Sequence, residues 1–114
     1  MKFTSLTVNK IIKKYFNKFN LTERDLEFLK RIYNVSIKRY ERRILNIGFK
    51  ENSKILDAGC GFGQWTLAFL NQKYSVSGID FSDERINFCE VLQKELLIPN
   101  NTFKKSKLGK ITFE

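Results

Sequence analysis

The sequence predicts an α/β fold, a doubly wound parallel sheet of about three strands preceded by helices. Two observations support this fold class. After residue 50, short apolar runs alternate with helical patterns in the order strand, helix, strand, helix, strand. Before residue 50, apolar residues recur at steps of three and four, which is typical of amphipathic helices. A chain of 114 residues with 42% hydrophobic content suits one small globular domain.

The first fifty residues predict two amphipathic helices. From Thr7 to Asn20 the apolar positions recur at helical spacing. Thr22 is a favourable N-cap for a second helix, whose apolar stripe runs unbroken through residues 26–47. Gly48 follows the stripe, and glycine is the common residue just after a helix end. This stretch therefore predicts one helix of about six turns after the first.

The second half of the chain predicts alternating strands and helices. Lys54–Ala58 is a short apolar run that stops at a glycine cluster, as a buried parallel strand does. Ser82 is a favourable N-cap for a later helix that runs to Pro99. The elements after the first strand are a helix, a strand, a helix and a strand, at residues 62–72, 74–79, 82–98 and 102–107. We divide the chain into a basic helical cap, residues 1–50, and a sheet domain, residues 51–114.

Composition excludes several classes of protein. The chain has no histidine, which excludes imidazole bases and histidine-bound metal centres. Cys60 and Cys89 are too few for a disulfide framework or a four-cysteine zinc site, so we expect no metal. No apolar run approaches the roughly 20 residues of a membrane span, and the N-terminus lacks a signal-peptide pattern. We therefore expect a cytoplasmic protein. The formal charge is +9, and the first fifty residues hold 13 basic and 4 acidic side chains.

A glycine-rich loop, residues 57–63 (DAGCGFG), lies between the first strand and the following helix. Glycines at alternate positions allow positive φ and let a ligand approach the backbone closely. The helix that follows offers free N–H groups at its N-terminus. Asp80 ends the second strand, where a carboxylate can accept hydrogen bonds from ribose hydroxyls. The glycine-rich loop and the Asp80 carboxylate together predict a nucleotide-like ligand.

The details of the loop favour one kind of nucleotide. A dinucleotide fingerprint needs glycine where this chain has Gln64, which disfavours an NAD-dependent enzyme. The runs ILDAGCGFG and VSGIDFS closely resemble motif I and the acidic ribose motif of class I S-adenosyl-L-methionine-dependent methyltransferases, over residues 54 to about 98. The resemblance implies a Rossmann-like fold. It also implies transfer of a methyl group from S-adenosyl-L-methionine to an unidentified acceptor, with a small molecule favoured.

The resemblance also implies a set of cofactor-binding residues. The three loop glycines would line the methionine and ribose portion, and Asp57 would lie near the amino end. Asp80 would hold the ribose hydroxyls, and Phe81 would lie against the adenine. Cys60 lies within the loop and is interpreted as a small filler. The full set is Asp57, Gly59, Cys60, Gly61, Gly63, Asp80 and Phe81. No residue can be assigned as a catalytic base.

The chain departs from the family near its end. Members usually carry an acidic residue beside the adenine after the third strand, whereas Lys105–Gly109 holds no carboxylate. A seven-stranded sheet with six helices needs about 168 residues, and only 61 follow position 53. We therefore expect the first three strands only, as in the N-terminal part of a methyltransferase or a truncated relative.

A second class of function stays open, in which the chain is a non-catalytic basic module that binds RNA or a partner protein. Three interpretations of the basic helices remain. We favour the first interpretation, a solvated helix surface, over the other two. The second is contact with nucleic acid, because Tyr15, Tyr33 and Tyr40 interleave with the cations. The third is a helix at residues 7–20 lying on anionic lipid.

Overall fold

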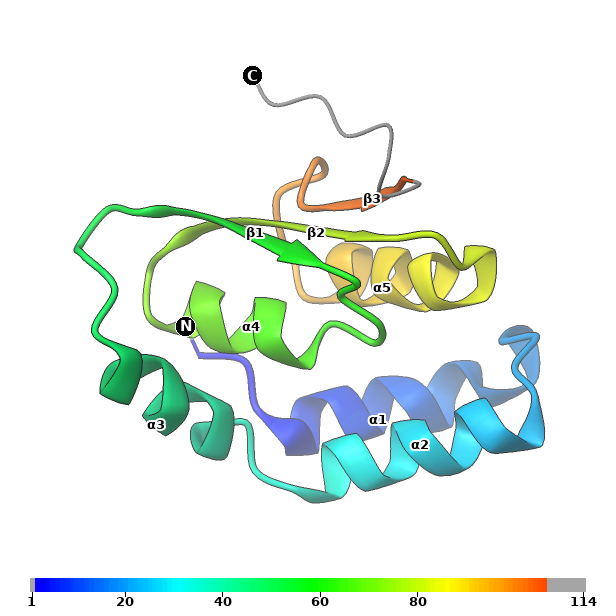
Figure 1. Ribbon diagram of the computed structural model, residues 1–114. Helices are drawn as coiled ribbons and strands as arrows, with labels where there is room; N and C mark the ends of the chain where they lie inside the picture. Colours follow the sequence, from blue (N-terminus) through cyan, green and yellow to red (C-terminus); the bar gives the residue numbers. More distant parts are fainter. Residues whose placement is uncertain (1, 107–114) are drawn as a thin grey trace.

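The computed structural model describes residues 2–106, and it has a three-stranded parallel sheet in the order β1-β2-β3 (Figure 1). In the register of the first pair, Ile55 lies opposite Val76. The three strands are β1 (Lys54–Ala58), β2 (Ser75–Asp80) and β3 (Phe103–Lys105). This architecture confirms the predicted fold class. Residue 107, which the sequence includes in the third strand, lies outside the described residues.

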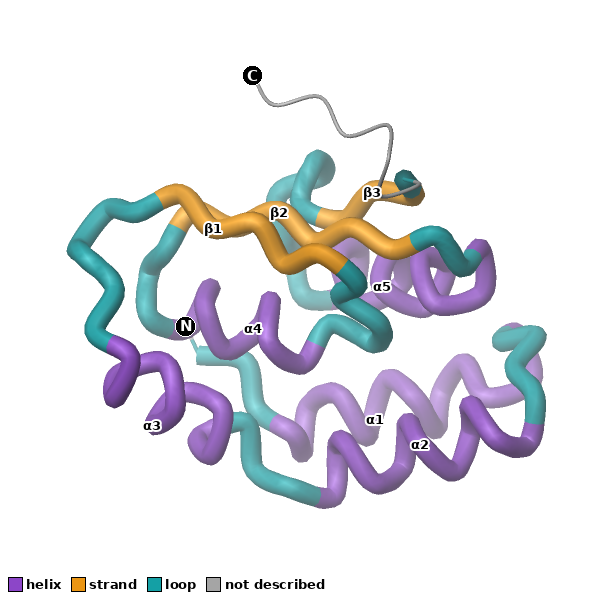
Figure 2. Tube along the Cα trace, in the orientation of Figure 1, coloured by secondary structure: helices purple, strands orange, loops and turns teal. Residues whose placement is uncertain are grey.

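Helices connect and support the strands from one side. The two crossover helices are α4 (Gln64–Asn71), between β1 and β2, and α5 (Asp83–Glu95), between β2 and β3. Figures 1 and 2 show both on the same face of the sheet, with the N-terminal helices beyond them. Those N-terminal elements are α1 (Ser5–Tyr15), a 3₁₀ turn (Phe16–Lys18), α2 (Glu23–Asn34) and α3 (Lys38–Ile47). The sheet thus has one face packed against a double layer of helices.

The prediction of one long helix through residues 26–47 is wrong, because the chain breaks between α2 and α3. Val35 is extended, with φ −88° and ψ 140°. The Ser5 hydroxyl of α1 compensates the broken helix ends: it donates to the Val35 carbonyl at 2.7 Å and accepts from the Ile37 N–H at 3.1 Å. The apolar periodicity continues across the break, so the pattern alone could not reveal it.

The predicted helix caps at three positions are confirmed. The Thr22 and Ser82 side chains accept hydrogen bonds from backbone N–H groups at the starts of α2 and α5. Gly48 ends α3 in the left-handed conformation, with φ 75°. These local signals mark the starts of α2 and α5 and the end of α3.

The first helix differs from its predicted range of Thr7 to Asn20. α1 begins at Ser5, because the Thr4 side chain caps it, and it ends at Tyr15, where a 3₁₀ turn follows.

One hydrophobic core joins the N-terminal helices to the sheet domain. Phe88 of α5 lies at its centre, with ring centroids 5.4 Å from Phe62 and 6.3 Å from Tyr33. All three side chains are almost completely buried. The helical cap is therefore packed directly onto the elements that carry the glycine loop. No helix within residues 2–106 has the length and apolar character needed to cross a membrane.

Candidate functional site

The glycine loop lies at the carboxyl end of β1 and leads into α4. The N–H groups of Gly59 and Cys60 both donate to the Ile79 carbonyl at 2.8 Å, which ties the loop to β2. Gly59 and Gly61 have φ values of 74° and 54°, a region that side-chain-bearing residues rarely adopt. A Cβ atom built at either position would meet no atom within 4 Å. The loop therefore leaves open space directly over its backbone.

Two further loop residues in the predicted set, Cys60 and Gly63, face the protein interior. A Cβ at Gly63 would lie 3.1 Å from the ring of Phe103 and 3.4 Å from the sulfur of Cys89. Cys60 is 2% exposed, and a Cβ built at Gly78 would lie 3.2 Å from the Cβ of Cys60. Gly63 thus allows β3 to pack tightly under the loop, and Cys60 fills the space beneath it.

Asp80 fastens the glycine loop to the start of α5. Its carboxylate accepts from the Gly61 N–H through Oδ2 and from the Ser82 N–H through Oδ1, both at 2.9 Å. The residue is only 3% exposed. An ionised carboxylate has about four lone-pair sites, so these two bonds leave acceptor capacity at the loop.

Asp57 lies close to Asp80 at the same edge of the sheet. Burial raises the pKa of Asp57, the hydrogen bond from the Thr66 hydroxyl at 2.8 Å opposes that rise, and the negative charge of Asp80 adds to it. Neither carboxylate forms a salt bridge with any residue in the described part of the chain. One buried and one partly buried carboxylate without a cation create a local field that favours a positively charged ligand.

Gln64 is a candidate site residue that is absent from the set predicted from the sequence. It is the first residue of α4, and its Oε1 is the one buried side-chain oxygen or nitrogen within residues 2–106 that has no hydrogen-bond partner. The helix also begins without a side-chain cap. An unpaired buried acceptor is costly, at about 1–3 kcal/mol, and a ligand donor would remove that cost. The sequence signal that could have identified Gln64 was its position as the first residue of the helix that follows the glycine loop.

Phe81 follows Asp80 and is the most accessible member of the predicted set. Its side chain is 66% exposed, so the ring is available to a ligand without rearrangement of the core. Among the described residues, no group of three or more His, Cys, Asp or Glu is placed to hold a metal ion.

Two buried side chains outside the loop hold its carbonyl groups. The Tyr33 hydroxyl of α2 donates to the Phe62 carbonyl at 2.6 Å, and the Cys89 thiol donates to the Gly61 carbonyl at 3.2 Å. Burial raises the pKa of both groups, so both stay protonated donors. Tyr33 is 1% exposed, which corrects its interpretation as an aromatic residue available to nucleic acid.

Comparison with known families identifies the class of domain. A family model described as a methyltransferase domain matches residues 49–114, more than half of the chain. The chain therefore belongs to the methyltransferase domain family, which confirms the resemblance drawn from the glycine loop and the second strand. No curated protein matches the chain.

Solved structures of the bifunctional kinase-methyltransferase WbdD share limited similarity with the chain. A medium-resolution structure is 25% identical over 68% of this chain and 16% of WbdD, with a TM-score of 0.43. A 2.2 Å crystal structure of WbdD is 19% identical over 88% of this chain and 24% of that chain, with a TM-score of 0.47. The chain thus spans less than a quarter of the length of these proteins.

Proposed function

We propose that this chain is the cofactor-binding part of an S-adenosyl-L-methionine-dependent methyltransferase, with the cofactor held at the glycine loop. The observation that carries the proposal is the pair of carboxylates beside the open space over Gly59 and Gly61, the buried Asp80 and the partly buried Asp57. S-adenosyl-L-methionine carries a sulfonium and an ammonium group, so its charge matches this field. The unpaired Gln64 oxygen supports the same conclusion, because it provides an acceptor for a ligand donor.

Each residue has a distinct task in this proposal. Asp80 accepts hydrogen bonds from the ribose hydroxyls with its remaining lone pairs, and Phe81 lies against the adenine. Asp57 faces the cationic amino end, and the uncapped N-terminus of α4 offers N–H groups to the carboxylate of the methionine portion. Bound S-adenosyl-L-methionine supplies an electrophilic methyl group for in-line transfer to an acceptor, for which a small molecule is favoured.

Calorimetric titration of the 114-residue protein tests the proposal. We expect S-adenosyl-L-methionine and its demethylated product, S-adenosylhomocysteine, to bind, and NAD not to bind. Preferential binding of NAD would contradict the proposal, as would the absence of binding to a protein shown by circular dichroism to be folded.

A pair of glycine variants locates the ligand. Gly59→Ala places a methyl group in the open space over the loop, at φ 74°. Gly48→Ala, at the end of α3, has a φ of 75° and equally open surroundings, so it introduces the same backbone strain away from the loop. We expect similar losses of stability, of about 1–2 kcal/mol, but weaker cofactor binding only for Gly59→Ala. Equal effects of both variants on binding would place the ligand elsewhere.

A further inference from the structure

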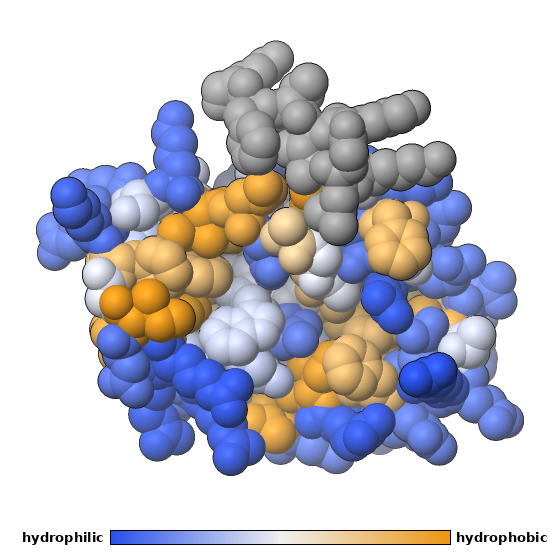
Figure 3. Space-filling view, in the orientation of Figure 1, coloured by the Kyte–Doolittle hydropathy of each residue, from blue (hydrophilic) through white to orange (hydrophobic). Residues whose placement is uncertain are grey.

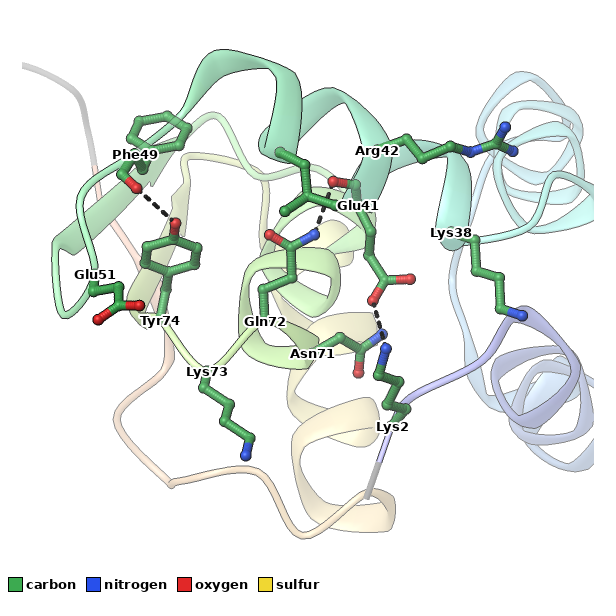
Figure 4. A pocket seen from close by; sticks show the side chains of 11 residues that line it. Lys2, Lys38, Glu41, Arg42, Phe49, Glu51, Asn71, Gln72, Lys73 and Tyr74 are labelled. Atoms are coloured by element: carbon green, nitrogen blue, oxygen red, sulfur yellow. Dashed lines mark hydrogen bonds and ion pairs between the residues drawn. The ribbon is translucent and has the colours of Figure 1, made fainter.

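A second concave surface lies at the other end of the sheet from the glycine loop. This groove has a volume of about 820 Å³ and is lined by α3, the segment before β1, the turn before β2 and Lys2 (Figure 4). Its lining segments precede β1 and β2, whereas the glycine loop and Asp80 lie at their carboxyl ends. Strands of this length separate the two sites by about 15 Å. The groove is thus independent of the proposed cofactor site.

The lining of the groove is rich in cations. It contains Lys2, Lys38, Arg42 and Lys73 but only two acidic residues, Glu41 and Glu51. Glu41 is buried and pairs with Lys2 at 3.8 Å. The other three cations form no salt bridge with any residue in the described part of the chain. Figure 4 shows Lys73 on one side of the lining and Lys38 and Arg42 on the other.

Aromatic and aliphatic side chains also line the groove, and Figure 4 shows Phe49 and Tyr74 on the side away from Lys38 and Arg42. Phe49 is 36% exposed, and the rings of Phe49 and Tyr74 are 6.1 Å apart. The Tyr74 hydroxyl donates to the Phe49 carbonyl at 3.1 Å, and Phe69 packs edge-on against Phe49 with the ring centroids 5.4 Å apart. These contacts hold the rings of Phe49 and Tyr74 in place, so they form a rigid part of the groove lining. Figure 3 shows apolar atoms gathered beside hydrophilic ones over α3 and the segment before β1.

We propose that this groove binds single-stranded nucleic acid. Grooves that bind single strands without sequence preference combine cations that follow the phosphates with aromatic rings on which bases stack. Lys38, Arg42 and Lys73 supply unpaired cations for the phosphates, and Phe49 and Tyr74 supply the rings at one end of the groove. Arg42 suits this task particularly, because a guanidinium binds phosphate oxygens in pairs. The aromatic pair favours nucleic acid over an acidic protein segment, which would use the cations alone.

Fluorescence anisotropy with a labelled oligouridylate of about ten nucleotides tests the proposal at several salt concentrations. The test variant is Lys38→Gln/Arg42→Gln in the groove. The matched control is Lys30→Gln/Arg31→Gln, which removes the same charge from exposed positions on α2 outside the groove. Each phosphate contact on a single strand contributes about 0.7 to the slope of log affinity against log salt. We expect the groove variant to lower that slope by about 1.4 and the affinity at about 0.1 M salt by roughly 25-fold, with little change in the control.

A third variant separates base stacking from general attraction of polyanions. Phe49→Leu keeps every cation but removes one ring, so oligouridylate binding should weaken about fivefold or more, with binding of polyglutamate unchanged. Equal losses in the two double variants would show charge attraction spread over the surface and would overturn the assignment to the groove. Polyglutamate binding as tightly as the oligonucleotide, with no effect of Phe49→Leu on either, would assign the groove to an acidic protein segment. Absence of oligouridylate binding at about 50 mM salt would also overturn the proposal.

Discussion

Replacement of Asp80 by asparagine perturbs the point at which the glycine loop, β2 and α5 meet. Both carboxylate oxygens accept backbone N–H groups at 2.9 Å, and the residue is 3% exposed. Asparagine retains one acceptor and turns an NH₂ donor toward the other N–H. One buried donor is left unsatisfied, and the surviving bond loses its charge, at a combined cost of about 2–4 kcal/mol. With an unfolding entropy of about 2.1 cal/mol/K per residue, a 114-residue chain should lose about 8–17 °C in melting temperature.

Thermal unfolding followed by circular dichroism measures this effect, and calorimetry measures S-adenosylhomocysteine binding on the same protein. We expect binding to weaken about ten- to a hundredfold, because hydrogen bonds to charged groups contribute about 1.5–3 kcal/mol each. The control is Glu90→Gln, which removes an exposed carboxylate from the middle of α5 that forms no salt bridge with a described residue, and it should change stability by less than about 0.5 kcal/mol. An Asp80→Asn protein that melts with the wild type would refute the anchoring of the loop by this carboxylate.

Three further results are expected. Tyr33→Phe leaves the buried Phe62 carbonyl without its donor, so the melting temperature should fall by about 4–12 °C, and an unchanged value would contradict that bond. Because the pKa of Asp57 is raised in the folded protein, its protonation stabilises the fold at acid pH, and this contribution is lost as pH rises through the raised pKa. The Asp57→Asn protein should therefore gain stability relative to wild type as pH rises, as measured by denaturant titrations at several pH values. A stability difference that does not depend on pH would contradict the raised pKa. Phe81→Ala, at an exposed position, should weaken S-adenosylhomocysteine binding in calorimetry without altering the melting temperature, and unchanged binding would remove the ring from the site.

Much of the fold could be predicted because the chain marks its elements with local chemistry. The β1 boundaries follow from an apolar run that stops at glycine, and Ser82 caps α5 as its residue type suggests. The break at Val35 could not be predicted, since it depends on Ser5, thirty residues earlier, to satisfy the freed backbone groups. A contact between distant segments of this kind leaves no periodic signal.

For the candidate site, too, local sequence patterns predicted which residues form the loop, whereas contacts between distant segments could not be predicted. The spacing of the glycines and the position of Asp80 predicted a ligand loop, and the structure brings these residues together. The sequence could not show that the Asp80 oxygens already hold two backbone N–H groups, or that Tyr33 reaches the loop from α2. In the sequence, Gln64 is only a departure from the dinucleotide pattern, and the burial of its side-chain oxygen is visible only in the folded chain. The cytoplasmic location stays a prediction.

The central claim is that the glycine loop holds the cofactor, and nuclear magnetic resonance of ¹⁵N-labelled protein tests it most directly. In a titration with S-adenosylhomocysteine, we expect the largest amide shifts at Gly59, Gly61 and Phe81, which lie around the open space at the ends of β1 and β2. Amides of α3 and of the turn before β2, which line the separate groove, should move little. Saturable binding that shifts the groove amides and leaves the loop unchanged would contradict the account, as would a folded protein whose spectrum does not respond to the ligand.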